Sequence, residues 1–488
     1  MLGRRRTFFR RDGRAGPRVG FPGARGLLLT VAAVVGVGLW TTACGDGGEP
    51  GSSPFDDGGL LDGGPARDDG SEDAGPVAPE LLLPRTGLVP EELAVLVADG
   101  DQVSEALGAY YLEARGLPMA NLVELPITTG EAVMSREDFA VVQNALAEAL
   151  PDGIQAFLLT WTEPYRVDCM SITTAFALGF DEAFCRTMAP CSPTAAIDYN
   201  GSASTRPFDD HGLRPTMMLA VRPDDADGEP DPDAAIAAGQ ALIDRGVAAD
   251  DTFPTGDGYY MRTGDNARSG PRALAFSQMP ELWSHDGGLR VFFRDGPGQG
   301  DDVVLRDVED VLFYATGAVR VADIASNRYL PGAVAEHLTS FGGQVPDSGQ
   351  MSILEWLEAG ATASYGTVIE PCNFPQKFPE HRLLVDFYVR GNTVVEALWK
   401  SVAWPGEGLF VGEPLARPWG RQDARVEGDE VVFTTTALGP RDEGVIEAAD
   451  DRDGPWRVVA DGFTTARPRQ VELRAPLDGA RFYRLGIR

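Results

Sequence analysis

The amino-acid sequence predicts an α/β protein in which helices cover both faces of a mainly parallel sheet, followed by a small antiparallel β-sandwich. Two observations predict this organisation. Between about residues 85 and 419, apolar runs of strand length alternate with segments of helical periodicity, which is typical of βαβ units. From residue 420 to 488, short alternating segments are separated by Gly, Pro and Asp, which is typical of a sandwich.

The N-terminal segment, residues 1–43, predicts a lipoprotein signal peptide. Several arginines precede the apolar run Leu27–Trp40, which is followed by small residues and Cys44. The run is shorter than the roughly 20 residues that span a bilayer. We expect Cys44 to be acylated and to become the mature N-terminus; the alternative is an ordinary cleaved signal with a chance cysteine. Arg5-Arg6 resembles a twin-arginine motif, so the export route stays open.

Residues 44–84 predict a disordered tether. The stretch is rich in Gly, Pro, Ser and Asp and has few apolar side chains to offset the entropy of ordering. Gly45–Glu80 holds ten acidic residues and one arginine, and the whole chain has a net charge of -31. This charge argues against nucleic acid as a partner, because phosphate binding requires clustered Lys and Arg. We expect an exported protein held by its lipid at the bacterial envelope, in the outer membrane.

The α/β region, residues 85–419, begins with a βαβ unit. "LAVLVAD" is a continuous apolar run, typical of a buried parallel strand. "DQVSEALGAYYLEARG" places Val103, Leu107, Tyr110 and Tyr111 on one helical face and stops at Gly116. "NLVEL" is the returning strand.

The same order repeats along the chain, with enough sequence for one large core or two subdomains. Further helices are predicted at "EDFAVVQNALAEAL", "DAAIAAGQALIDRG" with Asp233 as N-cap, "GQMSILEWLEAG" and "TVVEALWKSV". Further strands are predicted at "IQAFLLTW", "TMMLAV", "GYYMRT", "LRVFFRD", "VLFYAT", "ATASYGTVIE" and "GLFVGEP". The sandwich strands are "EVVFTTTAL", "GVIEAAD", "WRVVADG", "QVELRA" and "RFYRLGI".

The stretch "NRYLPGAVAEHLTSFGG", residues 327–343, predicts another helix. Pro331 suits a first helical turn, and Gly342-Gly343 would end the helix. The apolar residues at helical spacing are Val334, Leu338 and Phe341. His337 would border this apolar face, where packing explains it without a catalytic role.

Four cysteines follow the signal: Cys169, Cys185, Cys191 and Cys372. An even number in an exported protein favours two disulfides. We expect one bridge to close locally and the other to hold Cys372 against the 169–191 stretch, although the sequence leaves the pairing open. A free, nucleophilic Cys372 is the alternative.

No cofactor motif is present, and we predict none. Two acidic loops are weak candidates for calcium: residues 295–302, which a turn explains equally well, and residues 224–233, which lack the closing glutamate. His211 follows Asp209-Asp210, so Asp209 could orient the imidazole, but such a loop is more often solvated surface. We predict no metal site.

Five blocks together resemble a family of uncharacterised exported bacterial proteins. They are "VDCMSITTAFALGFDEAFC", "VLFYATG", "YLPGAVAEHLTSFGGQ", "GQMSILEWLEAGATASYGTVIEPCNFPQKFP" and "GNTVVEALWKSVAWPGEGLFVGEPLARP". The resemblance covers about Leu93 to Pro418 and implies an architecture rather than an activity.

A more distant resemblance is to the caspase-like fold of gingipain-type cysteine peptidases. The later parts are similar, with small residues at Gly360–Gly366, then Gly391–Ala397 and Gly412–Pro414. In those peptidases one strand ends in His-Gly and the next in the catalytic cysteine. Here "YATGAV" has no histidine, and Ala325-Ser326-Asn327 stand where we expect the cysteine. The resemblance therefore implies the scaffold without the aligned dyad.

Two functional hypotheses follow. In the first, the protein is an envelope lipoprotein that uses this scaffold to bind a protein or polysaccharide ligand, or to assemble with one. In the second, it is a peptidase-like surface hydrolase with relocated catalytic residues. The candidates for the second are Cys372, His337, His211 and Asp209, with Ser326 as a weaker nucleophile. The sequence does not decide whether the protein is an enzyme.

Overall fold

The computed structural model describes residues 78–185, 191–224, 228–285, 288–296, 303–467 and 469–488. The signal peptide, Cys44 and most of the tether therefore lie outside the described residues. Among the helices of the described ranges, none is long and apolar enough to cross a membrane.

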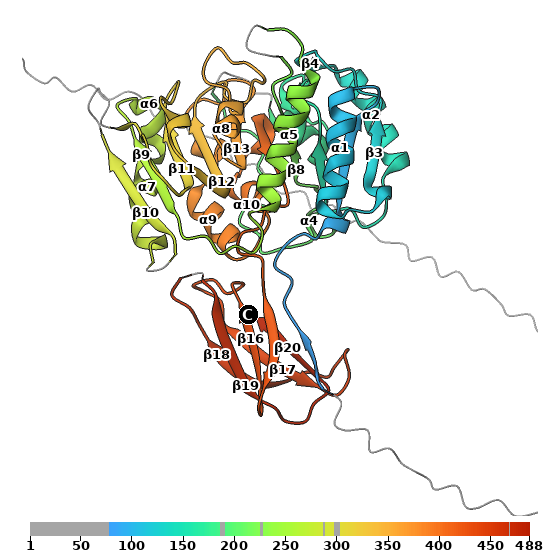
Figure 1. Ribbon diagram of the computed structural model, residues 1–488, viewed down its shortest axis with the longest axis vertical. Helices are drawn as coiled ribbons and strands as arrows, with labels where there is room; N and C mark the ends of the chain where they lie inside the picture. Colours follow the sequence, from blue (N-terminus) through green and yellow to red (C-terminus); the bar gives the residue numbers. More distant parts are fainter. Residues whose placement is uncertain (1–77, 186–190, 225–227, 286–287, 297–302, 468) are drawn as a thin grey trace, which may run out of the picture. The chain divides into compact units, whose positions relative to one another are not determined.

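A ten-stranded mixed sheet forms the centre of the α/β region (Figure 1). In spatial order the strands are β10 (Arg290–Asp295), β9 (Asp257–Arg262), β11 (Val311–Gly317), β12 (Tyr329–Leu338), β13 (Ala363–Thr367), β14 (Gly408–Gly412), β8 (Thr216–Met218), β5 (Ala156–Leu159), β2 (Leu93–Ala98) and β3 (Leu122–Leu125). Neighbouring strands are parallel except β13 and β14. This confirms the predicted mainly parallel sheet.

The antiparallel pair β13–β14 divides the sheet into two parallel halves that run in opposite directions. Thr367, at the end of β13, lies opposite Gly408, at the start of β14. The carboxyl ends of β9 to β13 therefore lie at one edge of the sheet, and those of β14, β8, β5, β2 and β3 at the other. Each edge is a place where an open α/β sheet can build a ligand site.

Helices pack against the sheet as the repeated alternation predicts. Long helices are α1 (Gln102–Arg115), α2 (Arg136–Ala149), α5 (Pro232–Val247), α7 (Ala273–Trp283), α9 (His381–Val389) and α10 (Val394–Ser401); shorter ones are α3 (Ile172–Leu178), α4 (Pro207–His211), α6 (Asn266–Ser269) and α8 (Leu354–Glu358). Helices α1 and α5 lie side by side over the sheet (Figure 1). Most of the apolar residues beneath the helices form one core cluster that includes strands of both halves. A second cluster lies around β9, β11, β12 and α8.

The predicted helix over residues 327–343 is wrong, because most of this stretch is strand β12. Val334 and Leu338 belong to one core cluster, whereas Ala333 and Ala335 belong to another. This alternation has the period of a strand buried on both faces. Pro331 lies in an irregularity of the pairing, between the positions where Val311 pairs with Tyr329 and Phe313 pairs with Val334, and such bulges tolerate proline.

Two smaller details of the helices also differ from the prediction. The N-cap of α5 is Asp231, whose side chain accepts from the Ala234 N–H, and not Asp233. The helix expected at "GQMSILEWLEAG" is limited to the five residues of α8. Helices α7 and α9 were not predicted.

The C-terminal sandwich consists of two small sheets around a separate core. One contains β15 (Asp423–Glu427), β16 (Glu430–Thr435) and β19 (Val471–Pro476). The other contains β1 (Glu80–Leu82), β20 (Phe482–Ile487), β17 (Gly444–Ala449) and β18 (Arg457–Phe463). Pairing is antiparallel except between β1 and β20. Residues 80–82, predicted to be tether, thus form an edge strand of the sandwich.

Candidate functional site

Both predicted disulfides are present. Cys169 bonds to Cys185 across 16 residues, and Cys191 bonds to Cys372 across 181 residues. One bridge is therefore local and the other holds Cys372 against the 169–191 stretch, as expected. A nucleophilic Cys372 requires a free thiol, and this disulfide leaves none.

His337 lies within β12 and is completely buried. Trp356 Nε1–H donates a hydrogen bond of 2.9 Å to His337 Nδ1. Burial lowers the pKa of His337 to about 4, because a charged ring in this apolar environment would lose its hydration. His337 is therefore a neutral acceptor that positions Trp356, and the structure does not bring it together with Cys372.

The other hydroxyl and carboxylate candidates have partners of their own. Ser326 lies in a turn before β12, where its Oγ donates to the Asp323 carbonyl and accepts from the Asp307 N–H. Asp209 accepts hydrogen bonds from Gln155 and Arg206, which lower its pKa. It does not orient His211.

His211 instead contacts a serine and a different aspartate. Its Nε2 lies 2.9 Å from Ser202 Oγ, and its Nδ1 lies 3.1 Å from Asp198 Oδ1. The second contact is a close approach without an aligned hydrogen bond. The buried ring of Tyr199 packs edge-on against the imidazole, with 5.4 Å between ring centroids. Sequence reasoning singled out His211 but missed Ser202 and Asp198, which precede it in "DYNGSAS".

The described parts of the two acidic loops show no cation site. Asp231 caps α5, and Asp295 pairs with Arg262. Residues 225–227 and 297–302 lie outside the described residues. Among the described residues, no group of three or more His, Cys, Asp or Glu side chains has the arrangement of a metal site.

A pocket of about 450 Å³ lies at the carboxyl ends of β9 and β11, beside α6. We call it the carboxyl-end pocket. It is lined by Thr263, Gly264, Asp265, Val303, Val304, Tyr314, Thr316, Ala318, Val319, Arg320, Val321 and Ala322. Its walls are mainly apolar, with Asp265 and Arg320 as charged groups. This combination, and its place at strand ends, is typical of ligand sites.

A chain of polar contacts beside the pocket connects the loop after β9 to the end of β12. Arg268 pairs with Asp265 at 2.8 Å and donates to Thr339 Oγ1 at 3.3 Å. Thr339 Oγ1 in turn donates to Gln350 Oε1 at 2.5 Å. At Gly317 a Cβ would lie only 2.4 Å from the Arg268 carbonyl carbon, so glycine permits this close approach. The loop and the strand end are thereby fixed relative to each other.

A buried charged cluster of Arg272, Glu336 and His381 lies on the opposite face of β12 from His337. Arg272 Nη1 and His381 Nε2 contact the same oxygen, Glu336 Oε1, at 2.5 and 2.9 Å. Burial alone would raise the pKa of Glu336, but Arg272 and His381 together lower it. Arg272 and His381 also border a pocket of about 270 Å³. The only sign of this cluster in the sequence is Glu336, a carboxylate within an apolar run.

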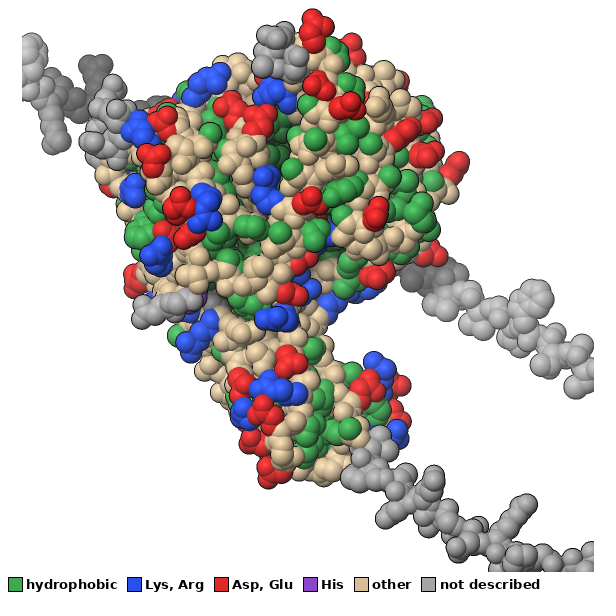
Figure 2. All heavy atoms as spheres, viewed as in Figure 1, with side chains coloured by type: hydrophobic (Ala, Val, Ile, Leu, Met, Phe, Trp, Pro, Cys, Tyr) green, Lys and Arg blue, Asp and Glu red, His purple; other side chains and the backbone are tan. Residues whose placement is uncertain are grey.

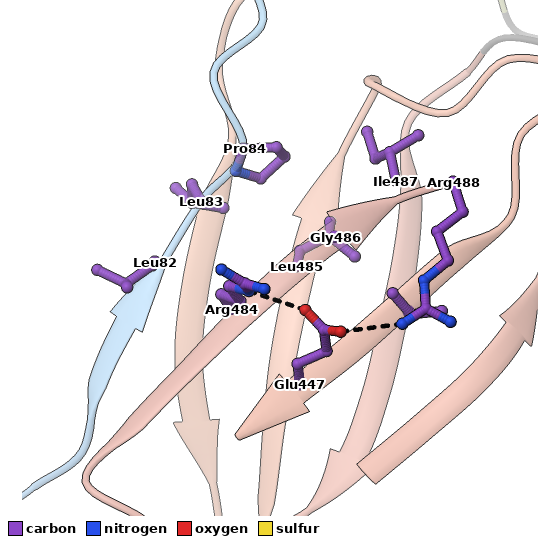
Figure 3. A pocket seen from close by; sticks show the side chains of 10 residues that line it. Leu82, Leu83, Pro84, Glu447, Arg484, Leu485, Gly486, Ile487 and Arg488 are labelled. Atoms are coloured by element: carbon purple, nitrogen blue, oxygen red, sulfur yellow. Dashed lines mark hydrogen bonds and ion pairs between the residues drawn. The ribbon is translucent and has the colours of Figure 1, made fainter. Parts of the chain in front are cut away.

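The sandwich carries a pocket of about 430 Å³ between the chain at Leu82–Pro84 and strands β17 and β20 (Figure 3). In Figure 3, Arg484 and Arg488 both reach Glu447, with contacts of 2.8 and 2.9 Å.

Across the face shown in Figure 2, Asp and Glu are distributed over the α/β region with Lys and Arg between them.

Comparisons of this chain with protein-family models, with curated proteins and with solved structures give no match.

Proposed function

We propose that the protein is an exported lipoprotein, anchored to the bacterial envelope through Cys44, whose caspase-like sheet binds a polypeptide ligand without cleaving it. The observation that carries the proposal is the carboxyl-end pocket, at the edge of the sheet where α/β proteins bind ligands. The two disulfides support an oxidising, extracytoplasmic location.

The order of elements supports the caspase-like interpretation. Strands β11 and β12, helix α8, strand β13, helices α9 and α10 and strand β14 follow in this order along the chain. The resemblance has the same order of two strands, a helix, a small-residue strand and a closing strand, and helix α9 is additional to it. In those peptidases the catalytic cysteine stands at the end of the second strand. Residues 329–338 form the second strand here, so the corresponding position is at Thr339 and Ser340 and not at residues 325–327. The histidine position falls on Gly317 and Ala318.

The residues at these positions favour binding over cleavage. Thr339 is 1% exposed and donates to Gln350, an amide that cannot act as a base. A peptidase dyad requires a nucleophile within hydrogen-bond reach of a base. The pocket beside Thr339 is nevertheless open and largely apolar. The arrangement suits a site that holds a ligand and leaves it intact.

The pocket lining favours a peptide with an apolar side chain. Val303, Val319 and Val321 supply apolar wall, and Asp265 and Arg320 offer partners for the N–H and C=O groups of a main chain. Burying one apolar side chain there contributes about 1.5–3 kcal/mol. That amount corresponds to about a tenfold to hundredfold gain in affinity.

The test is binding of fluorescent heptapeptides, each with one central apolar residue, measured by anisotropy. Val319→Asp places a charge in the pocket, and Val141→Asp changes a more exposed valine on α2, outside the pocket; the two valines are 39% and 59% exposed. We expect Val319→Asp to weaken binding at least tenfold and Val141→Asp to leave it within twofold. Mass spectrometry should recover the peptides uncut.

Three results would overturn the proposal. No binding by any peptide, or equal loss in both variants, would show that the pocket is not the site. Peptide cleavage that Ser340→Ala or Thr339→Val abolishes would favour the hydrolase hypothesis at this edge of the sheet.

A further inference from the structure

We infer that Ser202, His211 and Asp198 form a second site, independent of the carboxyl-end pocket, which hydrolyses carboxylic esters through an acyl-serine intermediate. Ser202 Oγ lies 2.9 Å from His211 Nε2, and His211 Nδ1 lies 3.1 Å from Asp198 Oδ1. A hydroxyl and a carboxylate thus approach the two opposite nitrogens of one imidazole. This resembles the arrangement by which a serine is activated on several unrelated folds, except that Asp198 makes no aligned hydrogen bond to Nδ1.

The contacts around His211 favour the tautomer that this chemistry needs. The negative charge of Asp198, 3.1 Å from Nδ1, favours a proton on Nδ1 although the two atoms make no aligned hydrogen bond. Nε2 is then left as the acceptor for the Ser202 hydroxyl. The Ser204 N–H donates to Ser202 Oγ at 3.1 Å. This donor stabilises the oxygen as it loses its proton. Tyr199, which is fully buried, limits rotation of the imidazole through its edge-on contact.

The other histidines in the chain have different partners. His337 accepts from Trp356, His381 contacts Glu336, and the ring of His285 faces the Trp283 carbonyl at 3.1 Å. His211 is the one of these four whose ring nitrogen meets a hydroxyl in the contacts described. Its side chain is 15% exposed, and Ser202 is half-buried. The nucleophile is therefore accessible from solvent while its base is largely shielded.

The reaction begins with transfer of the Ser202 hydroxyl proton to His211 Nε2 as Oγ attacks the ester carbonyl. A bond forms between Oγ and the carbonyl carbon, the ester C–O bond breaks, and the alcohol leaves with the proton from Nε2. Water then gives a proton to Nε2 and attacks the acyl carbon. The Oγ–acyl bond breaks, Ser202 Oγ takes the proton back from Nε2, and the carboxylic acid is released. Asp198 is 80% exposed, so it supports the imidazolium weakly. An ester suits this site better than an amide, because its leaving group departs more easily.

The experiment uses the full mature protein with a fluorophosphonate probe and with p-nitrophenyl acetate. We expect the probe to label Ser202, identified by peptide mass mapping, and ester hydrolysis to show a burst of p-nitrophenol equal to one acyl group per chain. General-base catalysis contributes about 10²–10⁴-fold. His211→Gln should therefore slow labelling of Ser202 at least a hundredfold, and Asp198→Asn should slow it less.

Ser326→Ala is the matched control, because it changes a loop serine that lacks an imidazole partner among its described contacts. It should keep the labelling of Ser202 within threefold. Ser202→Ala must lose the burst, and Ser202→Cys should regain reactivity toward iodoacetamide that depends on His211. Failure to label Ser202, or labelling unchanged in His211→Gln, would overturn the inference. Peptide binding at the carboxyl-end pocket should be the same in Ser202→Ala as in the parent, so each proposal can fail without the other.

Discussion

His337 should make the protein sensitive to acid in a specific pH range. Its folded pKa is about 4, against about 6.5 in an unfolded chain, so the unfolded state binds a proton first as the pH falls. The stability that the neutral ring contributes is complete above pH 6.5 and is lost as the pH falls toward 4. The shift of about 2.5 pH units, at about 1.4 kcal/mol each, gives a loss of about 3 kcal/mol by pH 4.

The assay is urea unfolding, followed by tryptophan fluorescence, at pH 7 and pH 4. His337→Gln keeps a carbonyl acceptor for Trp356 Nε1–H but cannot be protonated in this range. We expect the variant to lose about 3 kcal/mol less than the parent between the two pH values. Carboxylates elsewhere titrate in both proteins, so their contribution cancels in the difference. His285→Gln, at a partly exposed loop histidine, is the control. If His337→Gln and the parent lose equal stability, the assignment of acid sensitivity to His337 is wrong.

Three further outcomes are expected. Cys44→Ser should move the protein from the membrane fraction to the soluble fraction and remove its labelling by radioactive palmitate; unchanged fractionation would contradict lipid anchoring. Replacing Cys191 and Cys372 together by Ser should lower the free energy of unfolding by about 2–4 kcal/mol, measured by urea unfolding against the same protein with both disulfides. Glu336→Gln leaves Arg272 buried without its carboxylate partner and should lower the free energy of unfolding by about 3–5 kcal/mol. A loss below about 1 kcal/mol would show that the buried Arg272 does not need the Glu336 carboxylate.

Much of the sheet could be predicted, because buried parallel strands and amphipathic helices have different periods. Strand β2 and helix α1 show this, as an unbroken apolar run followed by a capped helix that ends at Gly116, whose φ is 66°. Strand β12 could not be predicted, because Pro331 imitates the start of a helix and Gly342-Gly343 imitate its end. The register irregularity that accommodates Pro331 depends on neighbouring strands, which a single sequence does not show.

The candidate sites were harder to predict than the elements, because they depend on contacts between distant residues. His211 could be found as a histidine near acidic residues, but the aspartate beside its ring is Asp198 and not Asp209. Likewise Arg272 and His381 meet Glu336 from 64 and 45 residues away. The fold brings these groups together, and the spacing of the residues along the chain does not indicate that they meet.

The parallel pair β1–β20 has a consequence for how the protein matures. Glu80 pairs with Phe482, so the first strand of the sandwich finds its partner 402 residues later. A chain that emerges from the ribosome or crosses the membrane from its N-terminus exposes β1 long before β20 exists. The α/β region can acquire its contacts in the meantime, whereas the sandwich closes only after β20 has been made. Pairing over so many residues must also overcome a large loop-closure entropy. Deletion of residues 482–488 would remove the partner of β1 and leave that strand unpaired.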